Sequence, residues 1–129
     1  MEDNPADAYL VQEALLEHNV RCQVVHIKDG EEGVNFVDRV QRGEANCPEL
    51  VILDLNLPRT HGLAVLEHMR ASSACAHILV VVLTCSNNQK DREQATRLGV
   101  SMYIRKPSRL DELLQLGAVF KDMMDKKSQ

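Results

Sequence analysis

A short apolar run that ends in an aspartate is the feature that most constrains the fold of this chain. Residues 50–53 are four consecutive apolar residues, set between Pro48 and Pro58, and Asp54 follows them directly. Such a run is typical of a strand that is buried on both faces of a parallel sheet. Open α/β sheets carry their reactive groups just outside the carboxyl ends of the strands. Asp54 is therefore predicted to be a metal ligand, a nucleophile, or both.

The rest of the chain alternates between helix and strand patterns. Strands are predicted at residues 22–27, 50–53, 77–83 and 102–105, and helices at 5–18, 31–42, 63–70, 88–98 and 109–126. This alternation predicts an α/β fold, a doubly wound parallel sheet with helices on both faces. The pattern begins with a helix, so the first strand that such a sheet should have before Glu2 is missing, and only Met1 stands in its place.

Length and charge exclude several classes of protein. The chain has 129 residues, which predicts one domain, and a net charge of −4, which argues against a nucleic-acid surface. No apolar run approaches the roughly 20 residues that span a bilayer. The start of the chain is polar and acidic, unlike a signal peptide. We expect a cytoplasmic protein that binds neither nucleic acid nor membrane.

The cysteines and histidines do not predict a disulfide framework or a zinc site. Cys22, Cys47, Cys75 and Cys85 are scattered and form no CxxC pair. Without a secretory signal, free and mostly buried thiols are expected. The five histidines form neither an HxxxH nor an HExxH pattern.

Other chemically active residues are predicted at the same rim as Asp54. Thr84 closes the strand at 77–83, Lys106 closes the strand at 102–105, and Glu2 and Asp3 would close the missing first strand. Phosphoryl transfer to a carboxylate requires such a set: a nucleophile, a cation site, and donors for the phosphoryl oxygens. The rim is therefore predicted to bind a phosphoryl group.

A hard divalent cation such as Mg²⁺ takes oxygen ligands in a six-coordinate shell. Asp3 and Asp54 are predicted to supply two ligands, and the main-chain carbonyl of Asn56 a third. Glu2 is predicted to hold a water bound to the cation. Asp54 would then attack as the nucleophile.

Several of these motifs together resemble a response-regulator receiver domain. They are Glu2–Asp7, Leu53–Pro58 with Gly62, Leu83-Thr84, and Tyr103–Pro107, at spacings from Asp54 to Thr84 and to Lys106 that match the family. The resemblance covers essentially the whole chain. Two features look most like single-domain regulators that partner phytochrome-type histidine kinases. They are segment 31–48 and the sequence Leu-Thr-Cys-Ser-Asn-Asn at residues 83–88.

The resemblance implies a flavodoxin-like fold of strand order 2-1-3-4-5 without its first strand. It also implies that residues 1–129 are one receiver domain, truncated at its N-terminus relative to the family, with no output domain. It implies that Asp54 is the phosphoacceptor and that Thr84 and Lys106 contact the phosphoryl group. Thr84 and Tyr103 would form the switch. The implied Mg²⁺ site consists of Asp3, Asp54 and the main-chain carbonyl of Asn56, with Glu2 acting through a water. A cis Lys106–Pro107 peptide bond is implied as well.

The function implied is that of a two-component phosphorelay switch: a sensor histidine kinase phosphorylates Asp54, and an altered surface binds a downstream protein. We expect no enzyme activity beyond slow self-phosphorylation and self-dephosphorylation. The missing strand favours an alternative, a receiver-like interaction module that is never phosphorylated, and predicts self-association. A second alternative is a haloacid-dehalogenase-like phosphohydrolase, although Asn56 stands where that class has a second aspartate.

Overall fold

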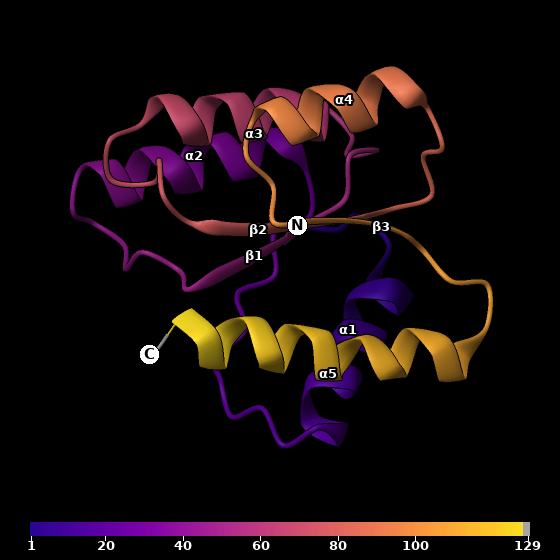
Figure 1. Cartoon of the computed structure of the whole chain (residues 1–129). Coiled ribbons are helices and arrows are strands. Elements are labelled where there is room, and N and C mark those ends of the chain that lie inside the picture. Colours follow the sequence, from indigo (N-terminus) through magenta and orange to yellow (C-terminus); the bar gives the residue numbers. More distant parts are fainter. Residues whose placement is uncertain (128–129) are drawn as a thin grey trace. The chain divides into compact units, whose positions relative to one another are not determined.

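The structure, a computed structural model, describes residues 1–127. Its elements in chain order are α1 (Pro5–Glu17), α2 (Gly30–Gln41), β1 (Leu50–Leu53), α3 (Gly62–Ala71), β2 (Leu79–Thr84), α4 (Gln89–Arg97), β3 (Met102–Arg105) and α5 (Leu110–Lys127) (Figure 1). They form two compact units. The first comprises Met1–Asp3 and Ile27–Arg105, and the second comprises Asn4–His26 and the chain from Lys106 onward.

The first unit is built on a parallel sheet of order β1-β2-β3. The central strand, β2, is the most deeply buried, because both its edges are paired and both its faces are covered. Helices α2, α3 and α4 lie on one side of this sheet (Figure 1). In register, Leu53 pairs with Val82 and Thr84 pairs with Arg105. The carboxyl ends of the three strands therefore meet at one edge, as predicted.

Side chains next to the helices of this unit satisfy the first backbone N–H groups. Asp29 accepts from the N–H of Glu32 at 2.8 Å at the start of α2, and Asn88 accepts from the N–H of Lys90 at 2.9 Å at the start of α4. His61 caps α3 through Nδ1, which accepts from Leu63 N–H at 3.2 Å. Each cap marks a helix start locally, close to the predicted one.

Gly62 brings the start of α3 against the backbone of Asp54. A Cβ at position 62 would lie 2.5 Å from the carbonyl oxygen of Asp54 and 2.6 Å from the Cα of Leu55, which no side chain tolerates. The N–H of Gly62 also donates to the carbonyl of Leu55 at 2.8 Å. Only glycine allows α3 to begin this close to the end of β1.

Arg70, near the end of α3, ties three parts of the unit together. Its guanidinium donates to four carbonyl oxygens, those of Leu98 (2.7 Å), Ile78 (2.8 Å), Ala76 (3.1 Å) and Gly99 (3.2 Å). Burial lowers the pKa of this guanidinium. The last turn of α3, the loop before β2 and the end of α4 are thus held by one side chain.

Met1 makes the backbone bonds of a strand with β1. Its ammonium donates to the carbonyl of Ile52 at 2.7 Å, and the N–H of Asp54 donates to the Met1 carbonyl at 3.0 Å. This is the bonding pattern of one parallel bridge. On the other side, the N–H of Glu2 donates to the carbonyl of Ile27 at 2.8 Å. Among residues 1–127, no strand is assigned before α1, and the sequence was expected to lack that strand.

The strand predicted at residues 22–27 is wrong, because that segment has no regular structure. Its side chains have the β-branched character of a strand, and Val24 and Val25 are exposed. In the expected strand order this segment would pair with the missing first strand. Strand propensity without a partner to complete the ladder does not produce a strand. The described sheet therefore has three strands, not four.

In the second unit, α1 packs against α5. The side chain of Asn4 caps α1 and accepts from Ala6 N–H at 2.9 Å, with Pro5 in the first turn. A Cβ on Gly117 of α5 would overlap the carbonyl of Ala14, so the two helices approach closely there. No helix in residues 1–127 is both long enough and apolar enough to cross a membrane.

None of the four cysteines forms a disulfide, as predicted, but the expectation that most are buried is wrong. Cys75 is buried, whereas Cys22, Cys47 and Cys85 are exposed. All four lie outside the helices and strands, so the pattern of these elements does not show which cysteines are buried.

Candidate functional site

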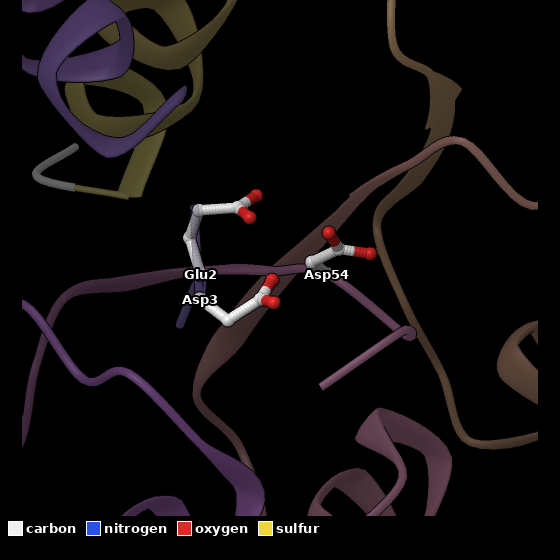
Figure 2. Close-up of side chains that lie close together, drawn as sticks. All are labelled: Glu2, Asp3 and Asp54. Atoms are coloured by element: carbon white, nitrogen blue, oxygen red, sulfur yellow. The ribbon is translucent and has the colours of Figure 1, made fainter. Parts of the chain in front are cut away.

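Three carboxylates meet at the carboxyl end of β1. Glu2, Asp3 and Asp54 each offer an oxygen, and these oxygens lie within 4.8 Å of one another (Figure 2). Asp54 directly follows β1, while Glu2 and Asp3 follow Met1, whose bonds to β1 fix the segment there. The rim predicted from the sequence thus contains the three acids that were assigned to it.

Asp54 is buried, and two donors hold its Oδ1 oxygen. The hydroxyl of Thr84 donates to Oδ1 at 2.7 Å, and the backbone N–H of Asn56 donates to the same oxygen at 3.0 Å. Asp54 is only 5% exposed and Thr84 is fully buried. A carboxylate removed from water needs such partners, and these two fix its orientation.

A chain of hydrogen bonds continues from Thr84 to the start of α4. The N–H of Ser86 donates to the Thr84 hydroxyl at 3.3 Å, and the Ser86 hydroxyl donates to Oδ2 of Asp91 at 2.9 Å. The Tyr103 hydroxyl donates to the carbonyl of Ser86 at 3.2 Å. The Tyr103 ring is half-buried, and the guanidinium of Arg92 lies 5.4 Å from its centre. Thr84 and Tyr103, the two predicted switch residues, are therefore linked through Ser86.

Lys106 directly follows Arg105, the β3 residue in register with Thr84. Its ammonium donates to Oδ2 of Asp7 at 2.9 Å, and its side chain is only 11% exposed. Asp7 lies in the first turn of α1, and no role was predicted for it beyond its place in the motif Glu2–Asp7. No local pattern reveals its contact with a residue 99 positions away.

The expectation of a cis Lys106–Pro107 peptide bond is wrong, because none of the described peptide bonds is cis. The trans form is the more stable one for most bonds that precede proline.

The chemistry of the acidic cluster fits a hard divalent cation. All three groups are carboxylates, and Mg²⁺ or Mn²⁺ prefers oxygen ligands to the thiols and imidazoles that zinc and copper favour. Asn56 is held in place through its N–H by Asp54. The role of its carbonyl as a ligand stays a prediction.

Comparison with known proteins identifies the family. Residues 1–117 match the family described as response regulator receiver domain, so this chain belongs to the response-regulator receiver family. It is 34% identical over 119 residues to the response regulator Rcp1 of Synechocystis sp., a match that covers 90% of this chain and 80% of that protein.

Solved structures agree. The phosphorylated cyanobacterial phytochrome response regulator RcpA is 34% identical, with a TM-score of 0.89 over 100% of this chain and 93% of that one. The Mn²⁺-bound form of response regulator Rcp1 is 31% identical, with a TM-score of 0.85 over 95% of this chain and 88% of that one.

These matches confirm the resemblance inferred from the motifs. The fold is the flavodoxin-like α/β fold of receiver domains, and the function is that of a phosphoacceptor in two-component signalling. Because the chain belongs to the receiver family, the alternative of a haloacid-dehalogenase-like phosphohydrolase is dropped. The extent of the domain over residues 1–129 stays a prediction, and residues 128 and 129 lie outside the described part.

Proposed function

We propose that Asp54 accepts a phosphoryl group from a phosphohistidine of a sensor histidine kinase, in a reaction that requires Mg²⁺. The observation that carries this proposal is the environment of the Asp54 carboxylate. It is buried, it is oriented by Thr84 and Asn56, and two further carboxylates lie within 4.8 Å. Crowded acids of this kind suit a cation that offsets their charge.

In the proposed transfer, an oxygen of the Asp54 carboxylate forms a bond to phosphorus. The bond from phosphorus to the kinase histidine nitrogen breaks, and its electron pair stays on that nitrogen. Thr84 and Lys106 are the proposed donors to the oxygens of the transferred group. The Thr84 hydroxyl, which now donates to Asp54, is well placed to change its acceptor when the carboxylate becomes an acyl phosphate.

Asp3 and Asp54 would hold Mg²⁺ directly, with the Asn56 carbonyl, and Glu2 would act through a water. Bound there, the cation offsets negative charge on the phosphoryl oxygens during transfer. The Mn²⁺-bound form of Rcp1 supports this assignment, since it is a relative of known fold with a divalent cation.

The proposed output is a change of surface, not catalysis. Movement of Thr84 would be passed to Tyr103 and to the start of α4, because Ser86 bonds to all three. Phosphorylation acts on such elements by adding charge at one point of a two-state network. We propose no enzyme activity beyond slow self-phosphorylation and self-dephosphorylation.

The proposed kinase is of the phytochrome type, because RcpA is a phytochrome response regulator. A kinase of this kind would place the protein in the cytoplasm. A downstream target protein and self-association complete the proposed partners. Faster phosphotransfer from a phytochrome-type kinase than from an unrelated one would support the pairing, and equal rates would contradict it.

The direct test uses acetyl phosphate and MgCl₂, with intact mass as the readout. The wild-type protein should gain one phosphoryl group in Mg²⁺ and none in EDTA. Asp54→Asn should remain unlabelled, whereas Asp111→Asn, which removes an exposed acid at the start of α5, should label normally. Equal labelling of wild type and Asp54→Asn would overturn the assignment of Asp54.

A further inference from the structure

One carboxylate that the proposed transfer does not use lies against Lys106. Oδ2 of Asp7 accepts from the Lys106 ammonium at 2.9 Å, which is the distance of a charge-assisted hydrogen bond. The Lys106 side chain is 11% exposed and that of Asp7 is 30% exposed. Water therefore screens this pair less than it screens a surface ion pair.

The helix alone does not account for this use of Asp7. An acid in the first turn gains from the helix dipole wherever its carboxylate points. The side chain of Asn4 already serves the first N–H groups of α1, at 2.9 Å from Ala6 N and 3.4 Å from Asp7 N. The Asp7 carboxylate is instead directed to a residue 99 positions away in the sequence.

Lysine carries its charge on a flexible four-carbon stem and loses considerable rotamer freedom when it is held in one place. An ammonium has three N–H donors, and the bond to Asp7 uses one of them. A fixed carboxylate next to the ammonium restricts the stem while it leaves donors for other acceptors. Asp7 thereby orders the Lys106 side chain before a phosphoryl group arrives.

We propose that Asp7 is a positioning residue for phosphoryl transfer and acts by holding the ammonium of Lys106. This inference rests on the proposed contact between Lys106 and the phosphoryl group. Misplacement of a group that contacts the reacting centre by about 1 Å can slow a reaction by up to about a hundredfold. Loss of one of several restraints on Lys106 should cost less, so we expect Asp7→Ala to slow phosphorylation by about tenfold.

The experiment measures the rate of phosphorylation by acetyl phosphate in Mg²⁺, from intact mass over time, at several donor concentrations. The variants are Asp7→Ala, Asp7→Glu, Lys106→Met and the double variant Asp7→Ala/Lys106→Met. Glu17→Gln is the matched control, because it removes an exposed acid from the same helix. Urea unfolding confirms that each variant is folded, and rates are referred to the folded fraction.

Asp7→Ala should be about tenfold slower than wild type, with Asp7→Glu recovering most of the rate and Glu17→Gln unchanged. In the Lys106→Met background, Asp7→Ala should not slow phosphorylation further, because Asp7 acts only through the Lys106 ammonium, which this background lacks. The same tenfold loss in that background would assign Asp7 a merely structural role and overturn the proposal.

Two other outcomes separate this inference from the proposed function. If Lys106→Met is slow and Asp7→Ala has the wild-type rate, the proposed function stands and the role of Asp7 is wrong. If Lys106→Met itself has the wild-type rate, the assigned phosphoryl contact of Lys106 fails, and the role of Asp7 fails with it.

Discussion

Thr84 donates its hydroxyl to Oδ1 of Asp54 across the ladder between β1 and β2, at 2.7 Å. The register explains why these two side chains meet. Leu53 pairs with Val82, so Asp54, just after β1, and Thr84, the last residue of β2, reach the same rim. A slip of one residue in either strand would turn its side chains to the opposite face. The strand pairing therefore brings Asp54 and Thr84 within hydrogen-bond distance of each other.

The first prediction concerns this hydrogen bond. Thr84→Val keeps the shape of the side chain and removes the hydroxyl, so buried Asp54 loses one of the two donors to Oδ1. A hydrogen bond to a charged group contributes roughly 1.5–3 kcal/mol. We expect the free energy of unfolding, measured in urea, to fall by about 2 kcal/mol.

Two controls isolate the hydroxyl. Thr84→Ser keeps the donor and should lose less stability than Thr84→Val. Thr96→Val makes the same chemical change at an exposed site of α4 and should change the free energy of unfolding by less than about 0.5 kcal/mol. An equal loss for Thr84→Val and Thr96→Val would contradict the importance of the bond to Asp54.

The second prediction concerns Arg70. Arg70→Met keeps an apolar stem of similar reach but removes the donors to four carbonyl oxygens, two in the segment before β2 and two at the end of α4. Carbonyls that lose their partners in a part-buried site cost stability. We expect the free energy of unfolding to fall by roughly 3 kcal/mol.

Arg70→Lys should be intermediate, because one ammonium cannot reproduce the planar fork of the guanidinium. Arg97→Met removes an exposed arginine from the last turn of α4 and serves as the control, with little expected change. Faster amide exchange at Leu98 and Gly99 in Arg70→Met alone would identify the end of α4 as the part released. Stability equal to that of Arg97→Met would show that the four bonds contribute nothing measurable.

The third prediction concerns the thiols. Burial raises the pKa of the Cys75 thiol, with a smaller contribution from Cys47. The thiolate is the reactive form, so a raised pKa keeps Cys75 protonated and unreactive as the pH approaches the ordinary thiol range. At pH 8, maleimide should label Cys22, Cys47 and Cys85 in the folded protein and reach Cys75 only after unfolding.

Peptide mass mapping from pH 7 to pH 9 checks this expectation. Labelling of the exposed thiols should become faster with pH, while labelling of Cys75 should follow the unfolding rate. Cys75→Ala should remove the single slow site and leave the fast ones. Labelling of Cys75 at the rate of Cys85 in the folded protein would be inconsistent with the described burial.

The parts of the fold that depend on local signals were predicted correctly from the sequence. The strands predicted at 50–53 and 102–105 match β1 and β3 residue for residue, since apolar or β-branched runs there are bounded by residues that break them. Asn4 and Asn88 cap their helices because a cap is a bond between near neighbours. The meeting of Asp54 and Thr84 also follows, because parallel strands align their carboxyl ends.

The parts that depend on distant partners could not be predicted in this way. The segment at 22–27 has the composition of a strand, but whether it becomes one is decided by the backbone beside it. The use of Asp7 by Lys106 joins residues 99 positions apart, and no periodicity encodes it. Arg70 is similar: its position on a helix is evident from the sequence, but its four acceptors come from two other segments, the loop before β2 and the end of α4.

The contact between Gly62 and Asp54 has a consequence for signalling. Because a Cβ on residue 62 would lie only 2.5 Å from the carbonyl oxygen of Asp54, the first turn of α3 packs closely on that peptide group, and we expect a displacement of the group to shift α3. Helix α3 would then sense the nucleophile through steric contact, by a route that involves neither hydroxyl nor aromatic ring. An isotope label at the amide of Leu63, in the first turn of α3, would thus report phosphorylation independently of any change in α4.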